Sequence, residues 1–232
     1  MGGMPIKRSY AAQGDACATS HAMELLGDRW TYPVLRELML APKRFAELEA
    51  AVRGITPAVL TARLRQLETS GLIRRTTLPA PARVSVYAVT EWAAELRPVF
   101  ESLARWALRS PVRDVDGCGL TPDAIVQSML TMARPLTMDP PLTVELRLAD
   151  LRVDPTAERY RYRLHWGERL SIARGEAPEA VVTIAGDSST WANVLYQDSG
   201  LDSMEVAGDT AVAQRLVDAY AGVLEDAGAF AP

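Results

Sequence analysis

The residue types that most often carry covalent or metal chemistry are scarce in this sequence. Its 232 residues include two cysteines, Cys17 and Cys118, and two histidines, His21 and His165. Two cysteines so far apart cannot build a disulfide framework or a cysteine-rich zinc site. No nucleophile–base pair, spaced carboxylate pair or glycine-rich phosphate loop stands out. The sequence therefore argues against an enzyme and predicts neither a metal ion nor a cofactor.

The arginines and lysines point instead to a polyanionic partner. The chain as a whole carries a net charge of -4, but the charge is unevenly divided. Residues 1–110 hold 15 Lys and Arg against 10 Asp and Glu, whereas residues 111–232 hold 10 against 19. Because an acidic surface is repelled by phosphate, we expect only the first part of the chain to meet DNA.

The segment after Gly54 has the pattern of a helix that could read a DNA groove. Thr56 is a good N-cap residue, and Pro57 suits the first helical position. Helical spacing puts Leu60, Leu64 and Leu67 on one apolar face. The opposite face lacks an acidic residue, and its small side chains suit close approach to base edges in a groove about 12 Å wide. This face comprises Ala58, Thr61, Ala62, Arg65 and Gln66.

The neighbouring segments supply a frame for this helix. Three helices are expected before it, within residues 17–26, 31–42 and 43–53, and two strands after it, within residues 72–77 and 83–89. Arginines flank this hairpin, as expected of a wing along a phosphate backbone. A further helix over 91–109 carries an apolar stripe that we expect to pack partly on the domain and partly on a second subunit.

The order of these motifs resembles the HxlR family of winged helix-turn-helix regulators over residues 8–110. The resemblance rests on Cys17, Met23-Glu24-Leu25-Leu26-Gly27-Asp28-Arg29-Trp30-Thr31, Leu35-Arg36-Glu37-Leu38, Pro42-Lys43-Arg44-Phe45-Ala46-Glu47-Leu48, Gly54-Ile55-Thr56-Pro57 and Val59-Leu60-Thr61-Ala62-Arg63-Leu64-Arg65-Gln66-Leu67-Glu68. It implies a homodimer on a pseudo-palindromic operator of double-stranded DNA, with the helix from Pro57 to Ser70 in the major groove. It brings no catalytic activity.

The resemblance also implies roles for individual residues. It assigns Thr56, Pro57, Ala58, Thr61, Ala62 and Arg65 to the groove face, and Arg44, Arg63, Arg74 and Arg83 to phosphate or wing contacts. Arg63 has an equal alternative, in which it covers the domain surface. Cys17 matches a cysteine that some members use to sense oxidants or electrophiles. Its alternative is a small buried side chain in the first helix.

Residues 111–119 are rich in Pro, Gly and Asp, and we expect a linker there between a DNA-binding and dimerisation domain, residues 8–110, and a ligand-binding domain, residues 120–230. The second domain is predicted to be α+β, with an antiparallel sheet. Its order of elements resembles the sterol-carrier-protein-like fold over residues 120–226, which implies an apolar tunnel. Candidate tunnel residues are Met129, Met132, Trp166, Trp191 and Tyr196.

Arg159, Arg161 and Arg163 share one face of an expected strand. They could form a second nucleic-acid patch, but a solvated face or pairing with carboxylates suits an acidic domain better.

The predicted function is a cytoplasmic, DNA-binding transcriptional regulator, associated with the nucleoid when bound and not with a membrane. We expect control by a hydrophobic small-molecule effector in the second domain. Two alternatives are a redox or electrophile sensor working through Cys17 and a lipid-carrier module tethered to DNA.

Overall fold

The computed structural model describes residues 10–79, 83–112, 117–132, 137–152, 156, 159–197 and 199–222. The chain divides into two compact units, Met1–Ala94 and Glu95–Pro232. The boundary between the two units lies before the expected linker at 111–119, because helix α6 (Arg97–Ala107) belongs to the second unit. Within this unit the Arg105 guanidinium donates a hydrogen bond to the carbonyl of Thr131 at 2.8 Å. The domain limits 8–110 and 120–230 stay predictions; within these ranges, residues 8, 9, 80–82, 133–136, 153–155, 157, 158, 198 and 223–230 lie outside the described part, as do residues 113–116 of the expected linker.

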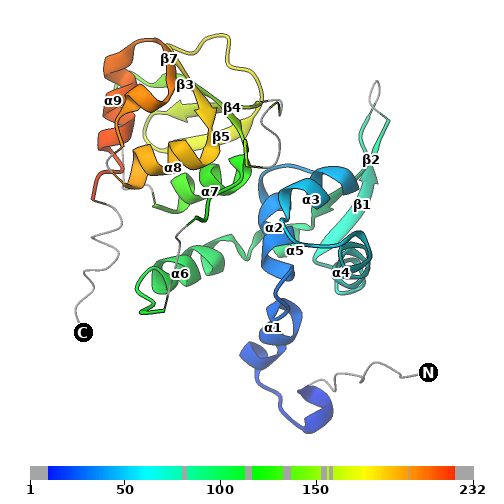
Figure 1. Ribbon diagram of the computed structural model, residues 1–232. Coiled ribbons are helices and arrows are strands. Elements are labelled where there is room, and N and C mark those ends of the chain that lie inside the picture. Colours follow the sequence, from blue (N-terminus) through cyan, green and yellow to red (C-terminus); the bar gives the residue numbers. More distant parts are fainter. Residues whose placement is uncertain are drawn as a thin grey trace. The chain divides into compact units, whose positions relative to one another are not determined.

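The first unit consists of short helices and one hairpin (Figure 1). Its elements are η1 (Ala11–Gln13), α1 (Ala18–Leu26), α2 (Thr31–Leu40), α3 (Phe45–Ala51), α4 (Pro57–Thr69), β1 (Ile73–Thr77), β2 (Ser85–Val89) and α5 (Glu91–Ala94). Apolar side chains spaced at three or four residues on α2 and α4 meet residues of the hairpin in one core. The order of elements is that of a winged helix-turn-helix, as expected.

A buried ion pair ties this core together. Lys43 Nζ lies 2.7 Å from Glu37 Oε2, and both side chains are almost fully buried. Arg36 holds the other oxygen of Glu37 at 3.0 Å. The backbone of Lys43 also pairs with Tyr87 of β2 through two hydrogen bonds, of 3.0 and 2.8 Å. Lys43, expected at the start of a helix, instead lies in a short extended segment beside the hairpin, and α3 begins two residues later at Phe45.

The second unit contains a five-stranded sheet in the order β5-β4-β3-β6-β7. Its elements are α6, α7 (Pro122–Met132), β3 (Leu142–Ala149), β4 (Tyr160–Trp166), β5 (Leu170–Arg174), β6 (Val182–Asp187), α8 (Ser188–Tyr196), η2 (Leu201–Ser203), β7 (Glu205–Gly208) and α9 (Thr210–Asp218). The unit is α+β, as expected, but the sheet is mixed and not purely antiparallel as predicted, because β3 and β6 pair in parallel while the other neighbouring strands pair antiparallel.

The parallel pair follows from the route of the chain. Strands β3, β4 and β5 form a meander, so β5 ends at one edge of the sheet. Residues 175–181 then cross to the far side of β3, and β6 enters in the direction of β3. Along this crossing, Arg161 pairs with Glu176 at 2.7 Å and Arg163 with Glu179 at 3.0 Å. Arg159 pairs with Glu205 at 2.6 Å. The three arginines on this face are therefore paired with carboxylates, which agrees with the interpretation preferred from the sequence over a second nucleic-acid patch.

Helices α7 and α8 lie side by side against the sheet and bury its apolar face (Figure 1). The N-terminal turn of α7 is fixed by a buried carboxylate: Asp123 accepts from the Tyr162 hydroxyl at 2.6 Å and from Arg174 at 3.0 and 2.7 Å. Since a buried charge is costly unless it is paired, these bonds anchor α7 on β4 and β5. In the described part of the chain no helix is long and apolar enough to cross a membrane.

Candidate nucleic-acid interface

The N-cap of helix α4 and the burial of its apolar face fix which side of the helix faces solvent. The Thr56 hydroxyl accepts from the backbone N–H of Val59 at 3.4 Å, and Pro57 occupies the first turn. Leu60, Leu64 and Leu67 are fully buried. The predicted N-cap and buried stripe are therefore present, and they turn the opposite side of α4 to solvent.

The solvent side of α4 contains the residues expected to face a DNA groove. Ala58, Ala62, Arg65 and Gln66 are exposed, and Thr61 is half-buried. The Thr61 hydroxyl donates to the carbonyl of Pro57 at 2.8 Å. Because its proton is used within the helix, Thr61 can serve only as an acceptor toward a base, whereas Arg65 brings donors. Small side chains beside one long cation leave room for close approach of the helix.

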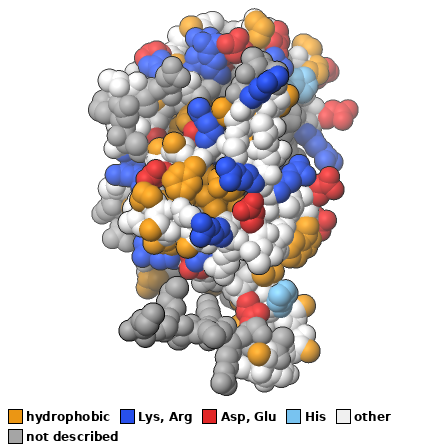
Figure 2. All heavy atoms as spheres, turned by 90° about the vertical axis from the view of Figure 1, so that its right-hand side faces the viewer, with side chains coloured by type: hydrophobic (Ala, Val, Ile, Leu, Met, Phe, Trp, Pro, Cys, Tyr) orange, Lys and Arg blue, Asp and Glu red, His pale blue; other side chains and the backbone are white. Residues whose placement is uncertain are grey.

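Basic side chains also surround this helix. Figure 2 looks onto this side of the first unit and shows Lys and Arg side chains spread over the face that carries α4 and the hairpin. Arg44 is exposed at the start of α3, where it pairs with Glu47 at 3.2 Å. Arg74 and Arg83 are exposed on the hairpin, and Arg83 has a left-handed backbone, with φ of 41°.

The exposed Arg53 was missed by the sequence reasoning, whereas Arg75, also exposed, was expected among the arginines that flank the hairpin. Arg53 lies directly before Gly54, whose φ of 79° turns the chain toward α4. Arg75 lies beside Tyr87 in the hairpin, on the opposite face from Arg74, and its Nε donates to Ser85 Oγ at 2.7 Å. The signal that could have identified Arg53 was its position as a cation directly before the glycine of the helix-turn-helix turn.

Arg63 differs from these arginines because its side chain is only 12% exposed. It forms an ion pair with Asp28 and donates to Gln66 Oε1 at 2.8 Å. Asp28 also accepts from the backbone N–H of Trp30 at 2.9 Å, so the pair links α4 to the turn between α1 and α2. The geometry favours the alternative in which Arg63 covers the domain surface over a phosphate contact.

Cys17 is an exposed free thiol at the N-cap of α1, so the alternative of a small buried side chain is not met. The backbone N–H of Ser20 lowers the pKa of the thiol below its ordinary value, because it stabilises the thiolate. The carboxylate of Asp15 accepts from the backbone N–H of Cys17 at 2.8 Å, and this bond lowers the pKa of Asp15.

The candidate tunnel residues of the second unit lie in its interior or at its edge. Met129, Met132, Trp166 and Trp191 are buried, and the Trp191 indole N–H donates to the Met129 sulfur at 3.4 Å. Tyr196 bonds Ser128 at 3.0 Å and lies edge-on to Tyr220, and burial raises the pKa of its hydroxyl. These contacts are those of a helix–sheet core. The described residues contain no group of three or more His, Cys, Asp and Glu that could hold a metal ion.

Comparison with known proteins agrees with the winged helix. Residues 25–113 match the model of the family described as HxlR-like helix-turn-helix. An uncharacterised HTH-type transcriptional regulator of Synechocystis is 41% identical over 87 residues, which are 37% of this chain and 64% of that protein. YvaP of Bacillus subtilis is 32% identical over 87 residues, 37% of this chain and 80% of YvaP.

YodB of Bacillus subtilis, named as an HTH-type transcriptional regulator, is 35% identical over 86 residues, 37% of this chain and 77% of YodB. The solved structure of its reduced form covers 42% of this chain and 97% of its own, with 31% identity and a TM-score of 0.39. The family match ends at residue 113, before the sheet of the second unit. Through residues 25–113, the chain belongs to the HxlR-like helix-turn-helix family of transcriptional regulators.

Proposed function

We propose that this protein regulates transcription as a homodimer on a pseudo-palindromic operator, with α4 of each subunit in the major groove. The observation that carries the proposal is the solvent side of α4. Ala58, Thr61, Ala62 and Arg65 face outward, no acidic residue lies between Pro57 and Leu67, and the buried leucines fix this orientation. The exposed arginines of the turn and hairpin would contact phosphates, and such contacts position a helix without reading sequence.

The homodimer is supported by the surface of α6. Val99, Leu103 and Trp106 recur at helical spacing and are all exposed, Trp106 at 67%. Within α6 no residue is buried by the described part of the chain. An apolar stripe with a large indole facing water is costly, and a second copy of the helix would cover it. Replacing Leu103 with Lys should shift the protein from dimer to monomer in analytical ultracentrifugation.

Footprinting tests the operator proposal. The purified protein is incubated with DNA from upstream of its own gene, and protection from DNase I is mapped. We expect protection of two similar half-sites about one helical turn, ~10 base pairs, apart, because each subunit places one helix in the groove. Uniform or absent protection at concentrations that saturate binding would contradict the proposal.

A second function, redox sensing, is favoured by the exposed Cys17 thiol and its lowered pKa. The relatives include a redox regulator, HypR, and a quinone-bound form of YodB has been solved. The Cys17 thiolate would attack hydrogen peroxide, break its O–O bond and become sulfenic acid, and the released hydroxide would take a proton from solvent to give water. Cys17→Ser should abolish any release of DNA by peroxide. Release that persists in this variant would remove the proposal.

The third proposal is that the second unit has a sterol-carrier-protein-like fold and binds an apolar small molecule. This molecule would be either a signal that controls DNA binding or the cargo of a lipid carrier tethered to DNA. One observation favours it: the Trp166 indole N–H is buried, at 3% exposed, without a hydrogen-bond partner among the described residues. A bound acceptor would satisfy it. Mass spectrometry of an extract of the denatured protein tests this, and extracts that contain no small molecule would count against it.

A further inference from the structure

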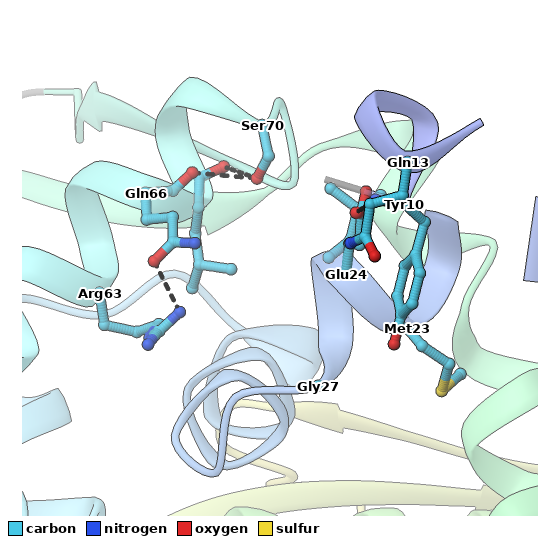
Figure 3. Close-up of a pocket in the computed structure, with 10 residues that line it drawn as sticks. Tyr10, Gln13, Met23, Glu24, Gly27, Arg63, Gln66 and Ser70 are labelled. Carbon is cyan, nitrogen blue, oxygen red and sulfur yellow. Dashed lines mark hydrogen bonds between the residues drawn. The ribbon is translucent and has the colours of Figure 1, made fainter. Parts of the chain in front are cut away.

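A half-open groove of about 630 Å³ lies between α1 and α4 in the first unit. Figure 3 shows its two walls. Arg63, Gln66 and Ser70 of α4 form one wall, and the opposite wall comprises Tyr10, Gln13, Met23, Glu24 and Gly27 of η1 and α1 and the chain around them. The volume lies within the range of small-molecule sites, roughly 300–1,000 Å³. All of its lining residues belong to the first unit, and on α4 they include Gln66, a residue that the sequence places on the outward face of this helix.

The apolar part of the groove suits a flat ring. Leu25 contributes aliphatic surface, and the buried Leu67 also lines the groove. Tyr10 and Met23 lie next to each other on one wall, and each is nearly half exposed, at 45% and 46%. A phenol ring and a thioether both make favourable contacts with aromatic rings. Two large apolar side chains left in water at one site indicate that something covers them.

The charged groups in the groove offset each other. Its lining includes one cation, Arg63, and one anion, Glu24. Arg63 is paired with Asp28, and Glu24 accepts from the backbone N–H of Tyr10 and lies 3.4 Å from His21 Nδ1. Because a charged ligand would have to break or crowd these pairs, the groove favours an uncharged molecule.

The polar groups define what this molecule must carry. Gln66 Oε1 accepts from Arg63 at 2.8 Å, so the amide offers its Nε2 hydrogens as donors. Ser70 spends its proton on the carbonyls of Gln66 and Leu67, at 3.0 and 3.2 Å. The α4 wall therefore presents a donor from Gln66, which calls for an acceptor on the ligand.

We propose that this groove binds an uncharged, planar aromatic molecule with a carbonyl-type acceptor, the ring against Tyr10 and Met23 and the acceptor at Nε2 of Gln66. The site would hold α1 against a flank of α4 that borders the proposed DNA face. Binding to the groove stands independently of the proposed function, whereas an effect of the ligand on DNA affinity rests on it.

The experiment uses coumarin as the probe, because it is planar and uncharged and carries a lactone carbonyl. The full chain is labelled with 13C at the methionine methyl groups, and the eight methionines are followed by NMR during titration. The Met23 signal is assigned from Met23→Leu. We expect a saturable shift of Met23 while Met129 and Met132 of the second unit stay unchanged.

Gln66→Glu removes the donor and adds a charge at an exposed position, and its side chain can still pair with Arg63. We expect this variant to bind coumarin about tenfold more weakly or worse, the cost of leaving a polar group unpaired. Gln197→Glu makes the same change at an exposed residue of the second unit and should leave binding unaltered. Benzoate and benzamidine, which are charged, should also bind at least ~10-fold more weakly.

Three results would overturn the proposal. The first is that the Met23 signal does not shift up to the solubility limit of coumarin. The second is that Gln66→Glu binds coumarin as tightly as the unchanged protein. The third is that the Met23 signal shifts with protein concentration when no coumarin is present, which would mean that a second copy of the chain fills the groove. A separate titration measures operator affinity with and without coumarin. Binding to Met23 without any change in DNA affinity would refute the coupling to DNA and leave the site itself standing.

Discussion

Replacing Lys43 with Met should strongly destabilise the first unit, because it strands a buried charge. Lys43 and Glu37 are almost fully buried, with 2.7 Å between their charged atoms. Removing one partner of a buried pair costs about 3–5 kcal/mol. Arg36 still contacts the other oxygen of Glu37 at 3.0 Å, so we place the loss near ~3 kcal/mol, the low end of that range.

Hydrogen exchange of the β2 amides measures this loss in the first unit alone. The Tyr87 N–H, bonded to the Lys43 carbonyl at 2.8 Å, exchanges only when this part of the unit opens. A loss of ~3 kcal/mol corresponds to exchange roughly 150-fold faster. The double variant Glu37→Leu, Lys43→Met removes both charges and should recover most of the protection. Less than a tenfold change in Lys43→Met, or a double variant no better than the single one, would refute the reasoning.

Three further predictions concern the surface. Arg65→Ala should weaken operator binding by about 1–3 kcal/mol, ~5- to 150-fold, as measured by fluorescence anisotropy. It should also reduce the difference in affinity between single-base variants of the operator. If that difference is unchanged, Arg65 does not read a base. Arg53→Ala should weaken binding to operator and to random DNA by the same factor in this assay, and it should lower the slope of log affinity against log salt by about 1. Weaker binding to the operator alone would contradict a phosphate contact. Alkylation of Cys17 by iodoacetamide, followed by peptide mass spectrometry, should stay fast to lower pH than for an ordinary thiol. The reason is that a lowered pKa keeps the thiolate populated until the pH falls below that pKa. A midpoint at or above that of free cysteine would contradict stabilisation of the thiolate by the Ser20 N–H.

The features that could be predicted from the sequence are those set by neighbours along the chain. Thr56 and Pro57 define the start of α4 through local capping and a preset φ. The leucine spacing that follows can bury only one face of a helix, so the outward face was predictable as well. The hairpin followed from two alternating strands with a proline-rich connection.

The features that the sequence did not reveal depend on residues far apart in the chain. Lys43 pairs with Tyr87 across 44 positions, and nothing local distinguishes it from a helix start. The parallel placement of β6 beside β3 depends on where residues 175–181 cross the sheet, which alternation within a strand does not encode. Arg63 is withdrawn from solvent by Asp28, a residue of another turn. The groove between α1 and α4 likewise exists only through tertiary packing.

Competition between operator and random DNA tests the central claim most directly. A fluorescent duplex that contains the protected half-sites and a duplex of scrambled sequence are titrated with the protein at several salt concentrations. The account predicts at least ~1,000-fold tighter binding to the operator at physiological salt and a steep, linear fall of log affinity with log salt. Equal affinity for the two duplexes, or operator binding that Arg65→Ala leaves intact, would contradict reading of DNA by α4.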